Sequence, residues 1–118
     1  MQFPSTLSLA AGLGFVAAAR AATKCIQFKV QSGNDYAVGA DGVDDIPGIC
    51  GGLWDNLKHS GACPVLGMHS CGAEGAGLVW KFGVTDFCNR GHVESAWWEA
   101  TKNRWGAIHC ECKGSTCV

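Results

Sequence analysis

Two stretches of the chain alternate between apolar and polar side chains, which is typical of half-buried β-strands. In residues 24–31 the apolar set, expected to face the core, is Ile26, Phe28 and Val30. In residues 77–84 the corresponding inward set is Leu78, Trp80, Phe82 and Val84. Residues 63–71 are a weaker strand candidate, and residues 107–112 predict the last strand. Residues 32–45 are rich in Gly, Asn and Asp and predict a loop.

Residues 46–58 carry apolar side chains at helical spacing and predict an amphipathic helix. The apolar stripe comprises Ile46, Ile49, Cys50, Leu53, Trp54 and Leu57. Asp44 or Asp45 can cap this helix, and Pro47 suits its first turn. Because Cys50 lies within the stripe, we expect its disulfide partner to come from the sheet beneath the helix.

Residues 90–105 predict a second helix, with Asn89 as its N-cap. At 100° per residue, Val93, Trp97 and Ala100 define the side that faces the core. Trp98 and Trp105 fall together on the shoulder of the same helix. A tryptophan there often packs against a loop, and the alternative is an exposed aromatic pair that stacks on a sugar ring or enters a pocket of a partner.

The predicted order of elements is therefore β-α-β-β-α-β. Since each helix has one apolar face and the clear strands have one as well, the pattern predicts an α+β domain with a four-stranded antiparallel sheet. Both helices would cover one face of it, in the ferredoxin-like or split βαβ plan. Lys29, Lys81, His109 and Glu111 would line the open face.

The N-terminus has the pattern of a secretory signal peptide. An apolar run spans residues 7–19, and small residues at positions 19 and 21 suit cleavage after Ala21. We therefore expect a signal peptide over residues 1–21 and a single cysteine-rich domain over residues 22–118, secreted to the extracellular space.

All eight cysteines follow the expected cleavage point, and an even number in a short secreted chain predicts a disulfide framework. The expected disulfide-forming residues are Cys25, Cys50, Cys63, Cys71, Cys88, Cys110, Cys112 and Cys117. Cys110 and Cys112 lie too far apart along one strand to bond each other, so they should anchor two different elements, a helix and a loop.

The charge of the chain is nearly balanced. Without Arg20 in the signal peptide, eight Lys and Arg stand against ten Asp and Glu, a net charge of −2. Nucleic acid is not expected as a partner, since that function requires a basic patch.

No second long apolar run follows the first, so we expect no membrane span. We expect a monomer.

A secreted eight-cysteine domain with this order of elements resembles the α-subunit of a virus-encoded killer toxin of smut fungi. It is also similar to small cysteine-rich secreted effectors of plant-associated fungi. The resemblance covers residues 25–117 and implies a non-enzymatic protein that acts on another organism. It carries no specific motif, so no functional residue transfers, and this chain lacks the dibasic sites at which the toxin precursor is cut.

Two groups of residues invite a metal-binding interpretation that the spacing does not favour. His109, Cys110, Glu111 and Cys112 lack the Cys-x₂₋₄-Cys pairs of zinc sites, and the thiols are expected in disulfides. Asp41, Asp44 and Asp45 lack the ligand spacing of a calcium loop and suit helix capping and turns. We therefore expect no metal and no cofactor.

Three functions remain open at this point. The first is a non-enzymatic secreted protein, of effector or killer-toxin type, that binds an extracellular protein or glycan of a host or competitor. The second is a small ribonuclease-type hydrolase, in which His109 and Glu111 act as acid and base across the open sheet face, joined by His69 and Lys81 from neighbouring strands. The third is a cell-wall carbohydrate binder that uses Trp98 and Trp105.

Overall fold

The computed structural model describes residues 23–113. The expected signal peptide (residues 1–21) and Cys117 lie outside these residues. The elements, in chain order, are β2 (Thr23–Val30), β3 (Gly33–Asp41), α2 (Ile46–His59), β4 (Val65–Glu74), β5 (Gly77–Val84), α3 (Arg90–Thr101) and β6 (Cys110–Lys113).

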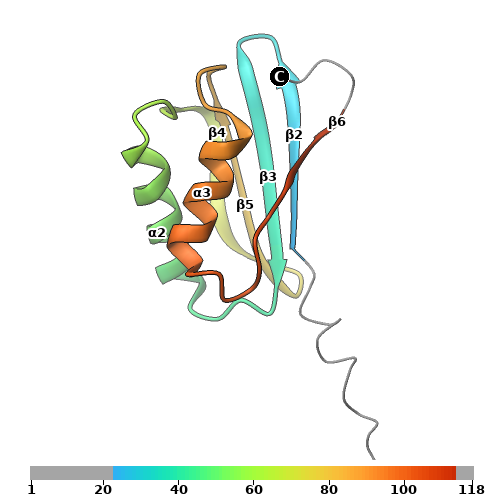
Figure 1. Ribbon diagram of the computed structural model, residues 1–118. Coiled ribbons are helices and arrows are strands. Elements are labelled where there is room, and N and C mark those ends of the chain that lie inside the picture. The colour runs from blue at the N-terminus through green and yellow to red at the C-terminus, as the bar shows by residue number, and fades with distance from the viewer. Residues whose placement is uncertain (1–22, 114–118) are drawn as a thin grey trace, which may run out of the picture.

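The strands form one sheet with α2 and α3 side by side on one of its faces (Figure 1). The prediction of an α+β domain with both helices on one face is confirmed. The predicted four-stranded antiparallel sheet is wrong, because the sheet has five strands in the order β4-β5-β3-β2-β6. Strand β6 lies parallel to β2, whereas the other neighbours are antiparallel.

The additional strand is β3, which occupies most of the segment predicted as a loop. It forms a hairpin with β2 and pairs along its other edge with β5. Tyr36, Val38 and Ala40 alternate towards the helices and are buried. The glycines and acidic residues between and beside them conceal this alternation in the sequence, because such residues are typical of turns.

The helix caps follow the sequence prediction closely. The Asp45 side chain accepts a hydrogen bond from the Gly48 N–H at the start of α2. Asn89 and His92 form a reciprocal capping box at the start of α3. The predicted extension of this helix to residue 105 is wrong: α3 ends at Thr101, because Lys102 and Asn103 both adopt left-handed backbone conformations (φ 53° and 60°).

The core lies between the helices and the strands β3 and β5. Trp80 and Phe82 of β5 are fully buried, with ring centroids 4.5 Å apart, and Tyr36 stacks on Phe82 at 5.5 Å. Trp97 is fully buried as predicted, and its indole N–H donates a hydrogen bond to the Gly106 carbonyl at 2.8 Å.

Three disulfides join described residues: Cys25–Cys110, Cys50–Cys71 and Cys63–Cys88. The predicted link from Cys50 on α2 to the sheet is confirmed, since Cys71 lies on β4. The expectation that Cys110 anchors a helix or a loop is wrong, because its partner Cys25 lies opposite it on the neighbouring strand β2. Cys112 is also disulfide-bonded.

Strand β2 places its side chains opposite to the prediction. Gln27 is fully buried on the helix side of the sheet, whereas Phe28 and Val30 are exposed on the other face. Lys29 also lies on the helix side, so its predicted position on the open face is wrong. No helix within residues 23–113 is long and apolar enough to cross a membrane.

Candidate functional site

Exposed apolar side chains gather at one end of the sheet. Six large apolar residues of the described chain are exposed: Phe28 (39%), Val30 (37%), Leu66 (47%), Met68 (51%), Phe87 (81%) and Trp98 (48%). All of these except Trp98 belong to strand segments or loops at the end where β2 and β5 finish. We call the group of Phe28, Val30, Leu66, Met68 and Phe87 the apolar end.

The strand register relates two of these residues, Phe28 and Leu66. Phe28 pairs with Asp35, Asp35 with Gly83, and Gly83 with Leu66, so one row across the open face runs from Phe28 to Leu66. Three strand spacings separate the two apolar side chains, a distance of about 14 Å. Met68 lies in a bulge of β4 beside Leu66.

The centre of this row is closely packed around Gly83. A Cβ atom at Gly83 would lie 2.7 Å from the Leu66 carbonyl oxygen and 2.7 Å from a carboxylate oxygen of Asp35. Glycine is therefore required at this position, and the Asp35 side chain lies over it between Phe28 and Leu66.

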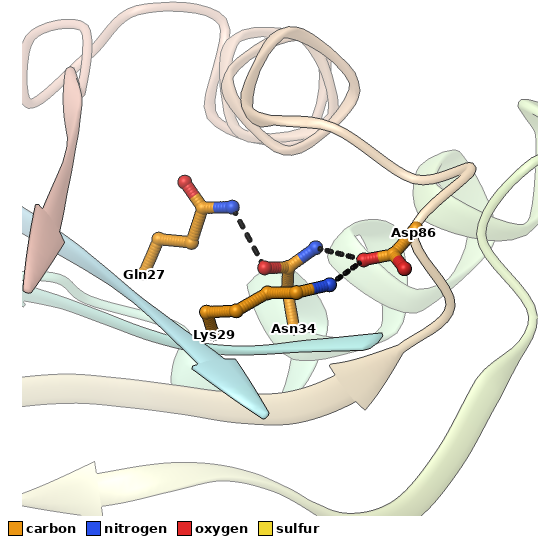
Figure 2. A network of polar contacts seen from close by, with 4 residues as sticks. All are labelled: Gln27, Lys29, Asn34 and Asp86. Carbon is orange, nitrogen blue, oxygen red and sulfur yellow. Dashed lines mark hydrogen bonds and ion pairs between the residues drawn. The ribbon is translucent and has the colours of Figure 1, made fainter. Parts of the chain in front are cut away.

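Phe87 occupies the loop between β5 and α3 and is held from both sides. Its neighbour Cys88 is bonded to Cys63, and its other neighbour Asp86 forms an ion pair with Lys29. Asp86 also accepts a hydrogen bond from the Asn34 side-chain amide at 3.3 Å (Figure 2). A large apolar side chain is thus presented to solvent on a loop whose position is constrained.

A buried pair of amides supports this loop from beneath. The Gln27 side chain donates a hydrogen bond to the Asn34 side-chain oxygen at 3.0 Å, and both residues are almost fully buried. Polar groups in such a place must be hydrogen-bonded to be tolerated. The polar residues of β2 therefore point inwards to reach Asn34 and Asp86, which leaves Ile26, Phe28 and Val30 on the open face.

Trp98 and Trp105, the predicted contact pair, are placed differently from each other. Trp98 is exposed on α3, whereas Trp105 is partly buried against the core and the Arg104 guanidinium covers its ring at 4.4 Å. Because α3 ends at Thr101, the helical spacing that grouped them does not extend to Trp105. No ring contact joins them in the described chain.

The residues named for a hydrolase do not all come together. His109 and Glu111 line a hollow of about 250 Å³ with Thr23 and Lys24 at the β6 edge. His69 lies on β4, at the opposite edge of the sheet, with its ring 6.0 Å from that of Trp54. The expectation that His69 and Lys81 join His109 from neighbouring strands is therefore wrong, because β3 and β2 lie between them.

A second polar hollow of about 240 Å³ lies between the two helices and contains His59, His92 and Glu99. His92 is engaged in the cap of α3, and Glu99 pairs with Lys102 at 3.6 Å. Their hydrogen bond and ion pair are those of ordinary helix stabilisation. Three potential metal ligands in residues 23–113, Cys63, Cys88 and His92, lie within 4.8 Å of one another, but the two sulfurs are bonded to each other.

Tyr36 is a buried ionisable group in the centre of the sheet. Its hydroxyl has no hydrogen-bond partner among residues 23–113, and burial raises its pKa to about 12, opposed by Arg90 and reinforced by Glu94. The phenol therefore stays neutral at physiological pH, and it contributes to the core rather than to a surface site.

No protein-family model matches the chain, no curated protein matches it significantly in sequence, and no solved structure matches it significantly.

Proposed function

We propose that this protein is a secreted, non-enzymatic binding protein that contacts a protein of a host or competitor organism through the apolar end. The observation that carries the proposal is the exposure of Phe87 on a loop held at both neighbouring residues. Large aromatic side chains that are already fixed in position lose little freedom on binding and dominate many protein interfaces.

Four further exposed apolar side chains at the same end of the sheet support the proposal. Leu66 and Met68 lie on β4, Phe28 and Val30 lie on β2, and the charged Asp35 lies between the two groups. Exposed apolar side chains interspersed with charged ones are typical of interaction sites. The three disulfides suit an extracellular setting.

A cell-wall glycan remains a second candidate because Trp98 is exposed on α3. An exposed indole ring can stack on a sugar, although Trp105 does not lie beside Trp98 to provide a second stacking ring. This candidate uses a different side of the molecule from the apolar end, so single substitutions separate the two functions.

The test applies the full chain, purified from the medium of a secreting host, to infiltrated plant tissue and to fungal cultures. Replacing Phe87→Ser should weaken the tissue response or the growth inhibition by about 10- to 30-fold, as expected for an interface anchor. The matched control is Trp98→Ser, which also removes an exposed aromatic side chain but should leave the activity unchanged.

A dose–response curve that is the same for Phe87→Ser and the unmodified chain would contradict the proposal, as would a chain that is inactive in both assays. Retention on chitin or glucan that Trp98→Ser abolishes would support the glycan function instead. RNA cleavage that His109→Ala abolishes would support the hydrolase.

A further inference from the structure

A largely apolar pocket of about 400 Å³ lies between the end of α2 and the start of β4. It is lined by Trp54, Leu57, Lys58, Gly61, Cys63, Pro64 and Val65. A cavity of about 150 Å³ already accepts a benzene ring, so this pocket has room for a large aliphatic or aromatic side chain.

The pocket has one charged group, Lys58, in the last turn of α2. Lys58 forms no ion pair with any residue between 23 and 113. Apolar walls with one cation at the rim complement an apolar group that carries a carboxylate close by.

The pocket adjoins the apolar end. Its wall residue Cys63 is bonded to Cys88, with 4.7 Å between their Cα atoms, and Cys88 follows Phe87 in the chain. Its wall residue Val65 precedes Leu66 on β4, an edge strand of the sheet; Val65 pairs with Val84 on the helix side, whereas Leu66 pairs with Gly83 on the open face. A partner that covers Phe87 and Leu66 and extends around this edge therefore reaches the pocket.

We propose that this pocket receives a bulky apolar side chain of the partner protein, and that Lys58 pairs with an acidic residue next to that side chain. The inference rests on the proposed function, because it takes the occupant to be part of a protein. The inference extends the proposed function by naming what determines specificity. Phe87 projects towards the partner, and the pocket selects a partner segment that has an apolar residue beside an acidic one.

The experiment uses short peptide probes and the ¹⁵N-labelled full chain. Acetyl-phenylalanyl-glutamate amide should produce saturable shifts at the amides of Lys58, Gly61 and Val65, with a Kd of about 1–10 mM. Acetyl-phenylalanyl-lysine amide should bind about fivefold more weakly, since an exposed ion pair changes affinity by about that factor. Acetyl-alanyl-glutamate amide should produce no saturable shift.

Two variants test the two halves of the site. Val65→Trp should fill the pocket and abolish peptide binding. Lys58→Glu, a surface change that leaves the core intact, should reverse the preference in favour of the lysine peptide. The matched control Lys24→Glu, on β2 away from the pocket, should bind both peptides as the unmodified chain does.

The outcomes separate this inference from the proposed function. Peptide binding that Val65→Trp abolishes, together with a tissue or growth response that both Val65→Trp and Lys58→Glu weaken, supports the inference. The absence of saturable shifts overturns it whether or not Phe87→Ser reduces activity. Full activity of Lys58→Glu overturns the role of Lys58 towards the partner, and octanoate binding more than about tenfold tighter than the peptide would assign the pocket to a small amphipathic acid instead.

Discussion

Strands β5 and β2 have the same alternating pattern but bury opposite halves of it. In β5 the apolar residues Trp80 and Phe82 lie under the helices, and Lys81 faces outwards. In β2 the polar Gln27 lies under the helices, and the apolar Phe28 faces solvent. The same sequence period therefore produces a core in one strand and an exposed surface in the other.

The difference shows how an exposed apolar surface can be maintained in a small domain. Gln27 and Lys29 face inwards because Asn34 and Asp86 offer them partners there. Those contacts also hold the loop that carries Phe87. The orientation of β2 therefore has two consequences. It lets Gln27 and Lys29 stabilise the interior, and it exposes Phe28 for the proposed binding role.

The largest expected effect on the free energy of unfolding is that of Phe82→Ala on β5. Phe28→Ala on β2 is the matched comparison. Phe82→Ala should lower the free energy of unfolding by about 3–5 kcal/mol, because it removes a fully buried ring from the core. Phe28→Ala should lower it by about 1–2 kcal/mol, because 39% of that residue is already exposed to solvent. Urea denaturation of both variants measures the contrast, and similar losses would show that the two faces do not differ in this way.

A smaller effect should appear at alkaline pH. The phenol pKa of Tyr36 is about 12 in the folded chain and about 10 when unfolded, so the folded state retains a proton that the unfolded state loses. Stability contributed by the neutral phenol is complete below pH 10 and falls by about 1.4 kcal/mol per pH unit between pH 10 and 12.

The matched variant for this prediction is Tyr36→Phe. It should lack this part of the alkaline slope. At neutral pH it should be at least as stable, because the hydroxyl that it removes has no hydrogen-bond partner within the described part of the chain. Thermal melts from pH 7 to pH 11.5 measure both quantities. An unchanged alkaline slope in the variant would contradict the assignment to Tyr36.

The smallest effect on stability should follow Asp86→Ala. The ion pair with Lys29 is partly exposed and should contribute no more than about 1 kcal/mol. Loss of the hydrogen bond from the Asn34 amide should add about 1 kcal/mol. Amide hydrogen exchange at residues 85–88 should nevertheless accelerate, because the loop loses one of its two anchors. Glu99→Ala, which breaks the exposed pair with Lys102, is the control and should leave that loop unchanged. Equal exchange in both variants would show that Asp86 does not hold Phe87.

Much of the architecture was predictable because it depends on local patterns. The apolar stripe of α2, the caps at Asp45 and Asn89, the inward face of β5 and the burial of Trp97 all follow from spacing along the chain. The link from Cys50 to the sheet followed from its place in that stripe. Such features are determined by neighbours three or four residues away in a helix, or two residues away in a strand.

The apolar end was not predictable from the same patterns. Phe87 is a single apolar residue in a loop, and nothing local shows whether it will be covered. Leu66 and Phe28 are 38 positions apart in the chain and meet in one row only through the pairing of β2, β3, β5 and β4.

The sequence by itself determined the α+β class, both helices and their caps, and the alternation within β2 and β5. Only the tertiary structure decided that residues 33–41 form a strand, that α3 stops at Thr101, and that β2 turns its apolar side outwards. The physical reason is that alternation specifies two faces without specifying which one is covered. That choice depends on distant partners, here Asn34 and Asp86, which the chain brings to Gln27 and Lys29 only when the sheet has formed.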